Sequence, residues 1–357
     1  MNEKHISVKR DAEFKTPRLQ KIGARNALID NVKGLVVLLY MVDHMLIHMP
    51  KDGFHTPAWA NHSNPVLIPS WGFNIIDLGP ILFFFVIGFV FFSSFIKKYE
   101  REGRAAYKQV FLRNTAFMGV FLGLFYFAGA FDPPASAWNT VPSIGFASLL
   151  VIPFLTPRIA KSPILKTLFA IGILLFYHFN QDSLFELLAY IPVNTNGVIE
   201  NTAYAGGMAA CIGYAAVILL SGAIADVSKK GIIPYAILTA ALWVFGRFIY
   251  LLDIPSFPSL NAAYMVSALS KINLFYFGFY VLDKLVIKGK RIPLLSAMGR
   301  NIMLYLLLVL ILQAVFALTG FPKAHNEAEA WIIIGVITVF YILLAIPLEK
   351  SKIVFKL

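Results

Sequence analysis

Long uninterrupted apolar blocks constrain the fold of this chain more than any other feature of its sequence. Most of them match the roughly 20 residues that an α-helix needs to cross a bilayer. Hydrophobic residues make up 58% of the chain and charged residues only 14%, against about a quarter in soluble proteins. The sequence therefore predicts an all-α, polytopic membrane protein. We expect about ten transmembrane helices, at 28–49, 72–96, 113–131, 141–157, 164–179, 204–225, 232–252, 262–283, 294–318 and 331–348.

Lys and Arg residues lie mainly in every second connection between these spans. The two tails and the connections on their side contain 25 of the 31 basic residues, whereas the opposite connections contain only Lys51 and Lys323. The positive-inside rule therefore predicts a multi-pass protein of the cell membrane with both termini in the cytoplasm. This orientation also explains the net charge of +12, so we expect membrane lipids and no nucleic acid as partners.

The predicted membrane domain is flanked by two short tails. A basic cytoplasmic tail covers residues 1–26, the ten-helix domain covers 27–348, and a cytoplasmic tail covers 349–357. The single Cys211 excludes a disulfide within the chain and a cysteine metal cluster, and we expect no metal site. An oligomer is compatible with the sequence, which does not fix the oligomeric state.

The first span combines a membrane-spanning length with several ionisable side chains. At 100° per residue, Lys33, Tyr40, His44 and His48 fall on one helical face, with Asp30 one turn below Lys33. Ionisable groups in hydrocarbon are costly unless they face a polar interior, so this face predicts the wall of a polar cavity. A structural alternative is a Lys33–Asp30 pair at a helix end, with His44 hydrogen-bonded to a neighbouring helix.

The order of these groups along the span suits a transfer reaction. Histidine titrates near neutrality, which makes His44 a candidate general base without extreme tuning. Lys33 lies nearer the expected cytoplasmic end, where a cation can bind an anionic donor such as a nucleotide diphosphate. The sequence thus predicts phosphate binding near the cytoplasm and chemistry deeper in the membrane.

Motifs in the first two spans are similar to those of a known family. The first motif is Asp30-Asn31-Val32-Lys33-Gly34, with His44 eleven residues after Lys33. The second is LGPILFFFVIGFVF at residues 78–91, in which six positions are in register: Gly79, Leu82, Phe83, Phe84, Gly88 and Phe89. Both resemble the acyltransferase-3 family of membrane O-acyltransferases, which modify surface glycans and related acceptors. The family has Arg where this chain has Lys33.

Two later segments depart from the pattern of that family. Its Arg-Arg-x-x-Arg at the start of the third span is reduced here to Arg113 followed by Asn114-Thr115-Ala116-Phe117. Its late Gly-x-x-Ser-Tyr-x-x-Tyr-Leu-x-His segment is represented by residues 297–310, which lack the Ser-Tyr pair and the final His. The same residues, from Gly299-Arg300-Asn301 to Tyr305, are also similar to a segment of the sibling glucosaminide acetyltransferases.

The resemblance implies a donor that enters from the cytoplasm. The donor would be an acyl-CoA, and acetyl-CoA is the expected one. The chain would be an enzyme that transfers acyl groups other than amino-acyl groups. The phosphates of the donor would meet Lys33, Arg113 and Arg300, next to Asp30. No metal cofactor is implied.

The resemblance also implies an acceptor on the extracytoplasmic side. His44 would act as general base on a hydroxyl or amine of a cell-surface glycan or small molecule, or would briefly accept the acyl group. Asp43 lies about 100° away from His44 on the helix and is the candidate residue to orient it. The candidates for acceptor binding are Tyr40, His48, Asp77, Arg247 and Lys271.

Two other classes of protein fit the same sequence. A transporter of a sugar, lipid or anion would also use basic residues at membrane depth, such as Lys271 and Arg247. Against it, the two halves of the chain show no repeat, and the motif lies in one helix. The third class is a degenerate acyltransferase-like protein that binds its ligands but no longer transfers an acyl group.

Overall fold

In the computed structural model, the described residues are helical and contain no β-strand. They are 27–49, 76–128, 140–188, 207–253, 260–320 and 322–351. The helices in the first half are α1 (Ala27–His48), η2 (Ile76–Leu78), α2 (Gly79–Glu102), α3 (Ala105–Ala128), α4 (Thr140–Leu150), η4 (Ile152–Phe154), α5 (Pro157–Lys161) and α6 (Pro163–Leu188). Those in the second half are α7 (Gly207–Ser228), α8 (Ile232–Leu252), α9 (Ala262–Leu282), η6 (Asp283–Ile287), α10 (Pro293–Arg300), α11 (Ile302–Thr319) and α12 (Glu327–Ser351).

Six of these helices are long and apolar enough to cross a membrane: α2, α6, α7, α8, α9 and α12. Helices α10 and α11 add a seventh span if the bent pair is counted as one. Helices α1 and α3 have comparable lengths of 22 and 24 residues but are not among the six. The described part of the chain therefore confirms an all-α, membrane-type protein, but it gives six or seven apolar spans where the sequence predicts ten.

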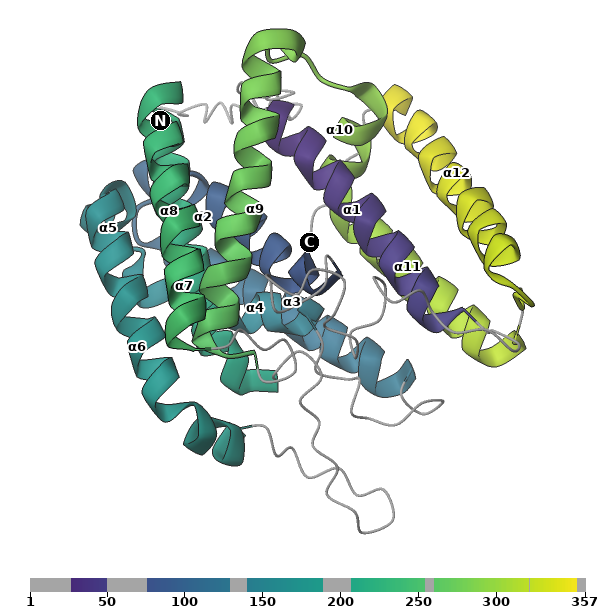
Figure 1. The fold of residues 1–357 in the computed structure, drawn as a ribbon, viewed down its shortest axis with the longest axis horizontal. Helices are drawn as coiled ribbons and strands as arrows, with labels where there is room; N and C mark the ends of the chain where they lie inside the picture. The colour runs from purple at the N-terminus through teal and green to yellow at the C-terminus, as the bar shows by residue number, and fades with distance from the viewer. Residues whose placement is uncertain are drawn as a thin grey trace, which may run out of the picture.

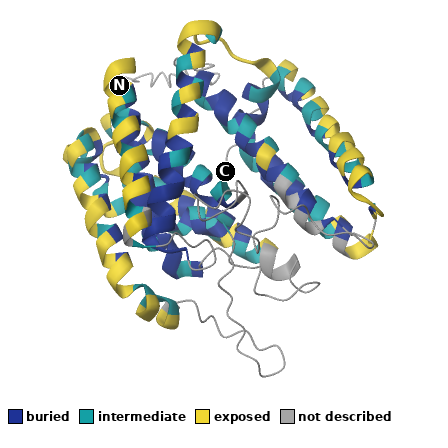
Figure 2. Cartoon of the chain, viewed as in Figure 1, coloured by how far each residue is buried: buried dark blue, intermediate teal, exposed yellow. Residues whose placement is uncertain are grey.

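Large apolar side chains cover the outward faces of several spans. Figure 2 shows the exposed residues on the outer sides of α6, α8 and α12, around a buried interior that includes α7. Ile164 on α6, Ile233 on α8 and Val336 on α12 are each at least 65% exposed. Such continuous apolar faces are unfavourable in water and are satisfied by lipid chains, so these faces fit the membrane interior.

The helices form two groups that can be followed in Figure 1. The larger group contains α2 to α9, with α7 packed against α2, α4, α6, α8 and α9. The smaller group contains α1, α10, α11 and α12, in which α1 packs against the other three. Helix α1 also contacts α2 and α9, so the helix with the sequence motif joins the two groups.

The fourth predicted span is shorter than expected. In place of one helix over 141–157, α4 ends at Leu150 and is followed by the separate short helices η4 and α5. Pro153 and Pro157 explain this break, because proline has no N–H to donate to the preceding helical turn. The predicted end of the fifth span at residue 179 is wrong as well, since α6 continues to Leu188.

The ninth predicted span, 294–318, is broken. Helix α10 ends at Arg300, α11 begins at Ile302, and their axes differ by 80°. Asn301, fully buried, lies at the break, where its side chain donates to the Ala297 carbonyl at 2.9 Å. A hydropathy pattern sees only a continuous apolar segment and therefore does not predict this bend.

Candidate functional site

The motif in the first span lies where α1 crosses α10. A Cβ atom at Gly34 would overlap the backbone carbonyl of Leu295, and one at Gly299 would overlap the backbone carbonyl of Asp30. The two helices therefore approach each other backbone to backbone, which only glycine permits at both positions. Gly34, the last residue of the Asp-x-x-Lys-Gly motif, thus has a packing role that its sequence context did not reveal.

Asn31, inside the same motif, ties α1 to the beginning of α10. Its side-chain Nδ2 donates to the Lys290 carbonyl at 3.3 Å, and its Oδ1 accepts from the backbone N–H of Ile292 at 3.1 Å. Asn31 is buried and links segments more than 250 positions apart in the sequence. Both partners of Asn31 are backbone groups, which a sequence motif does not reveal.

Arg300 lies at the end of α10 with its charge compensated. It forms an ion pair with Glu349 near the end of α12, and its Nε donates to the Ser296 carbonyl at 3.2 Å. Its side chain is only 5% exposed. Arg300 follows Gly299, whose backbone lies against the backbone of Asp30 on α1.

The predicted donor residues fall into two places. Asp30 is buried and Lys33 is half-buried, and both lie on α1 beside α10. Arg113 is exposed on α3, a helix that packs mainly against α4, α2 and η4. The structure therefore brings Asp30, Lys33 and Arg300 to one helix contact and places Arg113 on another part of the protein.

The helical face predicted to carry chemistry packs inside the protein as far as Tyr40. Val37 and Tyr40 are buried, and the Tyr40 ring meets Phe83 of α2 edge-on, with 5.2 Å between ring centroids. His44 follows Tyr40 by four residues, about one helical turn, along the backbone of α1. The side chains of Asp43, His44 and His48 are outside the part that the structure describes.

Asp77, a candidate for acceptor binding, is buried in η2. The backbone carbonyl of Asp77 accepts a hydrogen bond from the Tyr264 hydroxyl of α9, and Asp77 is only 2% exposed. Tyr264 is itself buried near the start of α9. The backbone of Asp77 therefore joins η2 to α9, a packing role in addition to the acceptor binding predicted for this residue.

Arg247 and Lys271 lie on the adjacent helices α8 and α9. The Arg247 guanidinium lies over the Trp243 ring, one turn earlier on α8, at 5.7 Å from its centroid. The Lys271 ammonium donates to the hydroxyl of Ser267, one turn earlier on α9, at 2.6 Å. The structure thus brings these two candidates together and away from the α1–α10 contact.

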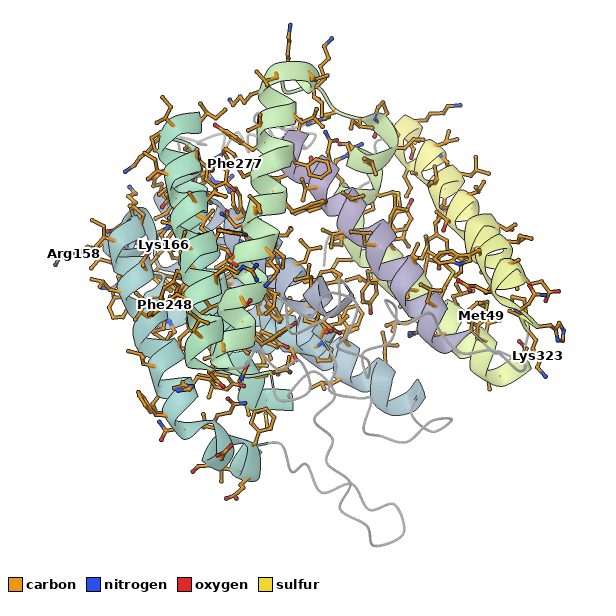
Figure 3. All side chains as sticks on the ribbon, viewed as in Figure 1. Met49, Arg158, Lys166, Phe248, Phe277 and Lys323 are labelled. Carbon is orange, nitrogen blue, oxygen red and sulfur yellow. The ribbon has the colours of Figure 1, made fainter. Side chains whose placement is uncertain are left out.

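Lys166 is a buried charge that lies inside the predicted span 164–179, although it was counted with the basic residues of the preceding connection, 158–166. It lies in α6 with no exposed surface, and its ammonium pairs with Asp226 of α7. It also donates to the carbonyls of Gly222 and Ala160, at 3.1 and 3.2 Å, and lies over the Phe92 ring. Figure 3 shows Lys166 among the helices and Arg158 pointing outward. With these partners the ammonium fastens α6 to α7 and α2.

Comparison with models of known protein families and with curated proteins gives no match to this chain. The resemblance to the acyltransferase-3 family therefore rests on the quoted motifs alone. Among the described residues, no group of three or more His, Cys, Asp or Glu side chains is arranged to hold a metal ion. The candidate site therefore consists of helix contacts and single ionisable residues.

Proposed function

We propose that this chain is an integral membrane acyltransferase that moves an acyl group from cytoplasmic acyl-CoA to an extracytoplasmic acceptor. Acetyl is the acyl group that we propose. The observation that carries the proposal is the Asp30, Lys33 and His44 pattern on α1, in register with the Val37–Tyr40 face that packs inward against α2. Ionisable groups on a buried face of a membrane helix are expected to serve a function. The acceptor class is a hydroxyl or amine of a cell-surface glycan or small molecule.

The proposed topology has ten spans with both termini in the cytoplasm. Helices α1, α3, α4 and α11 join the six apolar spans, and α10 lies beside α1 as a separate short helix. The alternation of basic and non-basic connections supports this arrangement. A fluorescent protein fused after Leu357 should fold and fluoresce, since this end is placed in the cytoplasm, whereas an alkaline phosphatase fusion there should be inactive.

The chemical step needs one base and no redox change. His44 removes a proton from the acceptor hydroxyl or amine as its oxygen or nitrogen attacks the thioester carbonyl of the donor. The new O–C or N–C bond forms, the C–S bond breaks, and the coenzyme A thiolate takes the proton back from His44. Asp43, its sequence neighbour, is the candidate to hold the imidazole in the required tautomer.

Lys33 and Arg300 have different roles in the proposed donor site. Lys33 is half-buried on α1, where an ammonium can bind the diphosphate of acyl-CoA as a point charge. Arg300 is paired with Glu349, so it positions α10 beside α1 instead of offering a free guanidinium. Arg113, on the exposed surface of α3, is at most a point of first contact for the donor.

The decisive experiment replaces His44. His44→Ala should abolish transfer of labelled acetyl from acetyl-CoA to acceptor in membranes, while expression and thermal stability stay unchanged. His178→Ala, which removes a side chain 44% exposed on α6, is the matched control and should keep full activity. Retained turnover in His44→Ala would remove this residue from the mechanism.

A second experiment tests the phosphate role of Lys33. Lys33→Ala should raise the KM for acetyl-CoA about tenfold or more, whereas Lys33→Arg should stay within about threefold, because it keeps the charge. The assay is the initial rate against acetyl-CoA concentration at saturating acceptor. Equal behaviour of the two variants would mean that Lys33 is not a phosphate ligand.

The break between α10 and α11 favours a transporter as the second candidate. Transporters often bind their substrates at discontinuous membrane helices, and these two helices are bent by 80° at the buried Asn301. This candidate predicts counterflow of a labelled sugar or anion into proteoliposomes without consumption of acetyl-CoA. Acetyl-CoA hydrolysis or transfer without solute movement would favour the enzyme.

A further inference from the structure

The connection between α9 and α10 is a short, strongly basic turn. Helix α9 continues into the π-helical turn η6, which is followed by Lys288 and Gly289 at positive φ angles of 54° and 72°. The chain thereby turns away from the axis of α9 before α10 begins at Pro293. Figure 2 shows this connection, at the top of the view, mainly as exposed residues. We call residues 283–292 the basic turn.

The exposed charges of the basic turn all have the same sign. Its basic residues are exposed, namely Lys284, Lys288, Lys290 and Arg291. Its one acidic residue, Asp283, is buried. The basic segment at the end of α2 is different, because Glu100 and Glu102 lie among its basic residues and Glu100 pairs with Lys161 at 3.0 Å. The basic turn therefore presents an unbalanced positive surface, which attracts anionic groups.

Large apolar side chains are exposed within the same turn. Leu285 and Val286 are 67% and 68% exposed, and Ile292 is 38% exposed. Such side chains are unfavourable in water and favourable among lipid chains. The candidate membrane span that begins at Ala262 continues to Ile287, so the basic residues lie at the end of this span or directly after it. Basic residues beside exposed apolar ones at this position are typical of a segment at the lipid headgroups.

Neighbouring helices hold the basic turn at both ends. At its start, the Lys284 ammonium lies over the Tyr280 ring at 5.5 Å, and the Tyr280 hydroxyl donates to the Ser228 carbonyl of α7 at 3.1 Å. Lys230, two residues after Ser228, is exposed and adds a positive charge on this side. At its end, the two hydrogen bonds of Asn31 to backbone groups tie the turn to α1. A segment that is already fixed loses less conformational entropy on binding than a free loop does.

We propose that the basic turn binds the phosphate group of an anionic phospholipid in the adjacent leaflet. Lys284, Lys288 and Arg291 bind the phosphate oxygens, while Leu285 and Val286 lie among the acyl chains. The exposed apolar residues favour a lipid over a soluble phosphate compound, which needs no apolar neighbour. The inference requires only that this end of α9 reaches a membrane surface, and it does not depend on the proposed acyl transfer.

Native mass spectrometry of the detergent-solubilised full chain tests this site. The chain should retain phosphatidylglycerol more than phosphatidylcholine at equal lipid concentrations. Each basic residue near an anionic surface contributes roughly a factor of five to binding, so the variant K284Q/K288Q/R291Q should lower this preference about tenfold or more. The variant K284R/K288R/R291K keeps the charges and should keep the preference. The matched control K97Q/R101Q/K108Q removes three exposed basic residues near the α2–α3 connection and should change the preference by less than about twofold.

A second measurement uses the unaltered chain and so does not depend on how the variants fold. A phosphatidylglycerol analogue with a photoreactive headgroup should cross-link to the peptide that covers 283–292, and excess phosphatidylglycerol should remove the label. Equal retention of both lipids, or cross-linking only to other peptides, overturns the proposal. A preference that the control variant lowers as much as K284Q/K288Q/R291Q does overturns it too, because the preference then reflects total charge. Removal of the label by inorganic phosphate but not by phosphatidylglycerol would assign the turn to a soluble phosphate compound and overturn the lipid site.

Discussion

Two helix contacts in this protein are built from the same parts and differ in how they treat charge. At the α1–α10 contact, Gly34 follows Lys33, and Gly299 precedes Arg300. At the α8–α9 contact, Gly246 precedes Arg247, and its partner Ser270 precedes Lys271 on the other helix. Both contacts therefore place basic side chains next to the small residues that let the helices approach.

The difference lies in what meets the basic residues. Arg300 is buried and paired with Glu349, so its charge is compensated within the smaller helix group. Lys271 donates to the hydroxyl of Ser267 on its own helix at 2.6 Å, and Arg247 lies over the Trp243 ring of α8. A buried charge that is compensated by a residue of another helix fastens the two helices together, whereas a hydrogen bond within one helix does not. Burial alone does not separate the two roles.

The largest effect is expected where compensation is removed from the buried arginine. Glu349→Gln leaves the Arg300 guanidinium without its counter-charge. This change should cost about 3 kcal/mol of stability, because the Arg300 side chain is only 5% exposed. The melting temperature of the detergent-solubilised protein measures this loss. The control Glu100→Gln breaks a pair with Lys161 that is about 60% exposed on both sides, and should change stability by under about 0.5 kcal/mol.

A smaller but clear effect is expected at the glycine of the motif. Gly34→Ala should cost about 2 kcal/mol, because the new methyl group meets a backbone carbonyl of α10 that cannot move without shifting the helix. Gly335→Ala on α12, where a Cβ meets nothing within 4 Å, should be neutral or slightly stabilising. Equal melting temperatures for the two variants would contradict the backbone-to-backbone contact.

The α8–α9 contact should tolerate the same change better. Gly246→Ala meets the side chain of Ser270 instead of backbone, so a cost of about 1 kcal/mol is expected. Adding Ser270→Gly removes the obstructing hydroxymethyl group and should restore most of the lost melting temperature. If the double variant is no more stable than the single one, the register assigned to these helices is wrong.

The helix limits show how much the sequence could predict. The expected spans 232–252 and 262–283 match α8 and α9 to within one residue, because each apolar block ends in a clear signal. One such signal is Asn261, whose side chain accepts from the N–H of Tyr264 and caps α9. Local patterns thus suffice where a helix is limited by its own neighbours in the sequence.

The misassigned segments depend on residues far apart in the chain. Lys166 was counted with the basic residues of a connection because its partner Asp226 is 60 positions away and leaves no local signal. The single span expected over 294–318 is broken beside Gly299, which packs against the backbone of α1. The same limit applies to the site, since the sequence aligned Lys33 with His44 but could not show that Arg300 is compensated by Glu349.

The smallest effect on stability is expected at Lys271 of α9. Lys271→Gln should change the melting temperature only slightly, equivalent to about 0.5 kcal/mol or less, because its hydroxyl partner Ser267 lies on the same helix. Glu349→Gln, measured alongside, should be several times more damaging. If Lys271 instead proved as important for stability as Glu349, it would be a fastening residue like Arg300. The contrast between the two contacts would then fail.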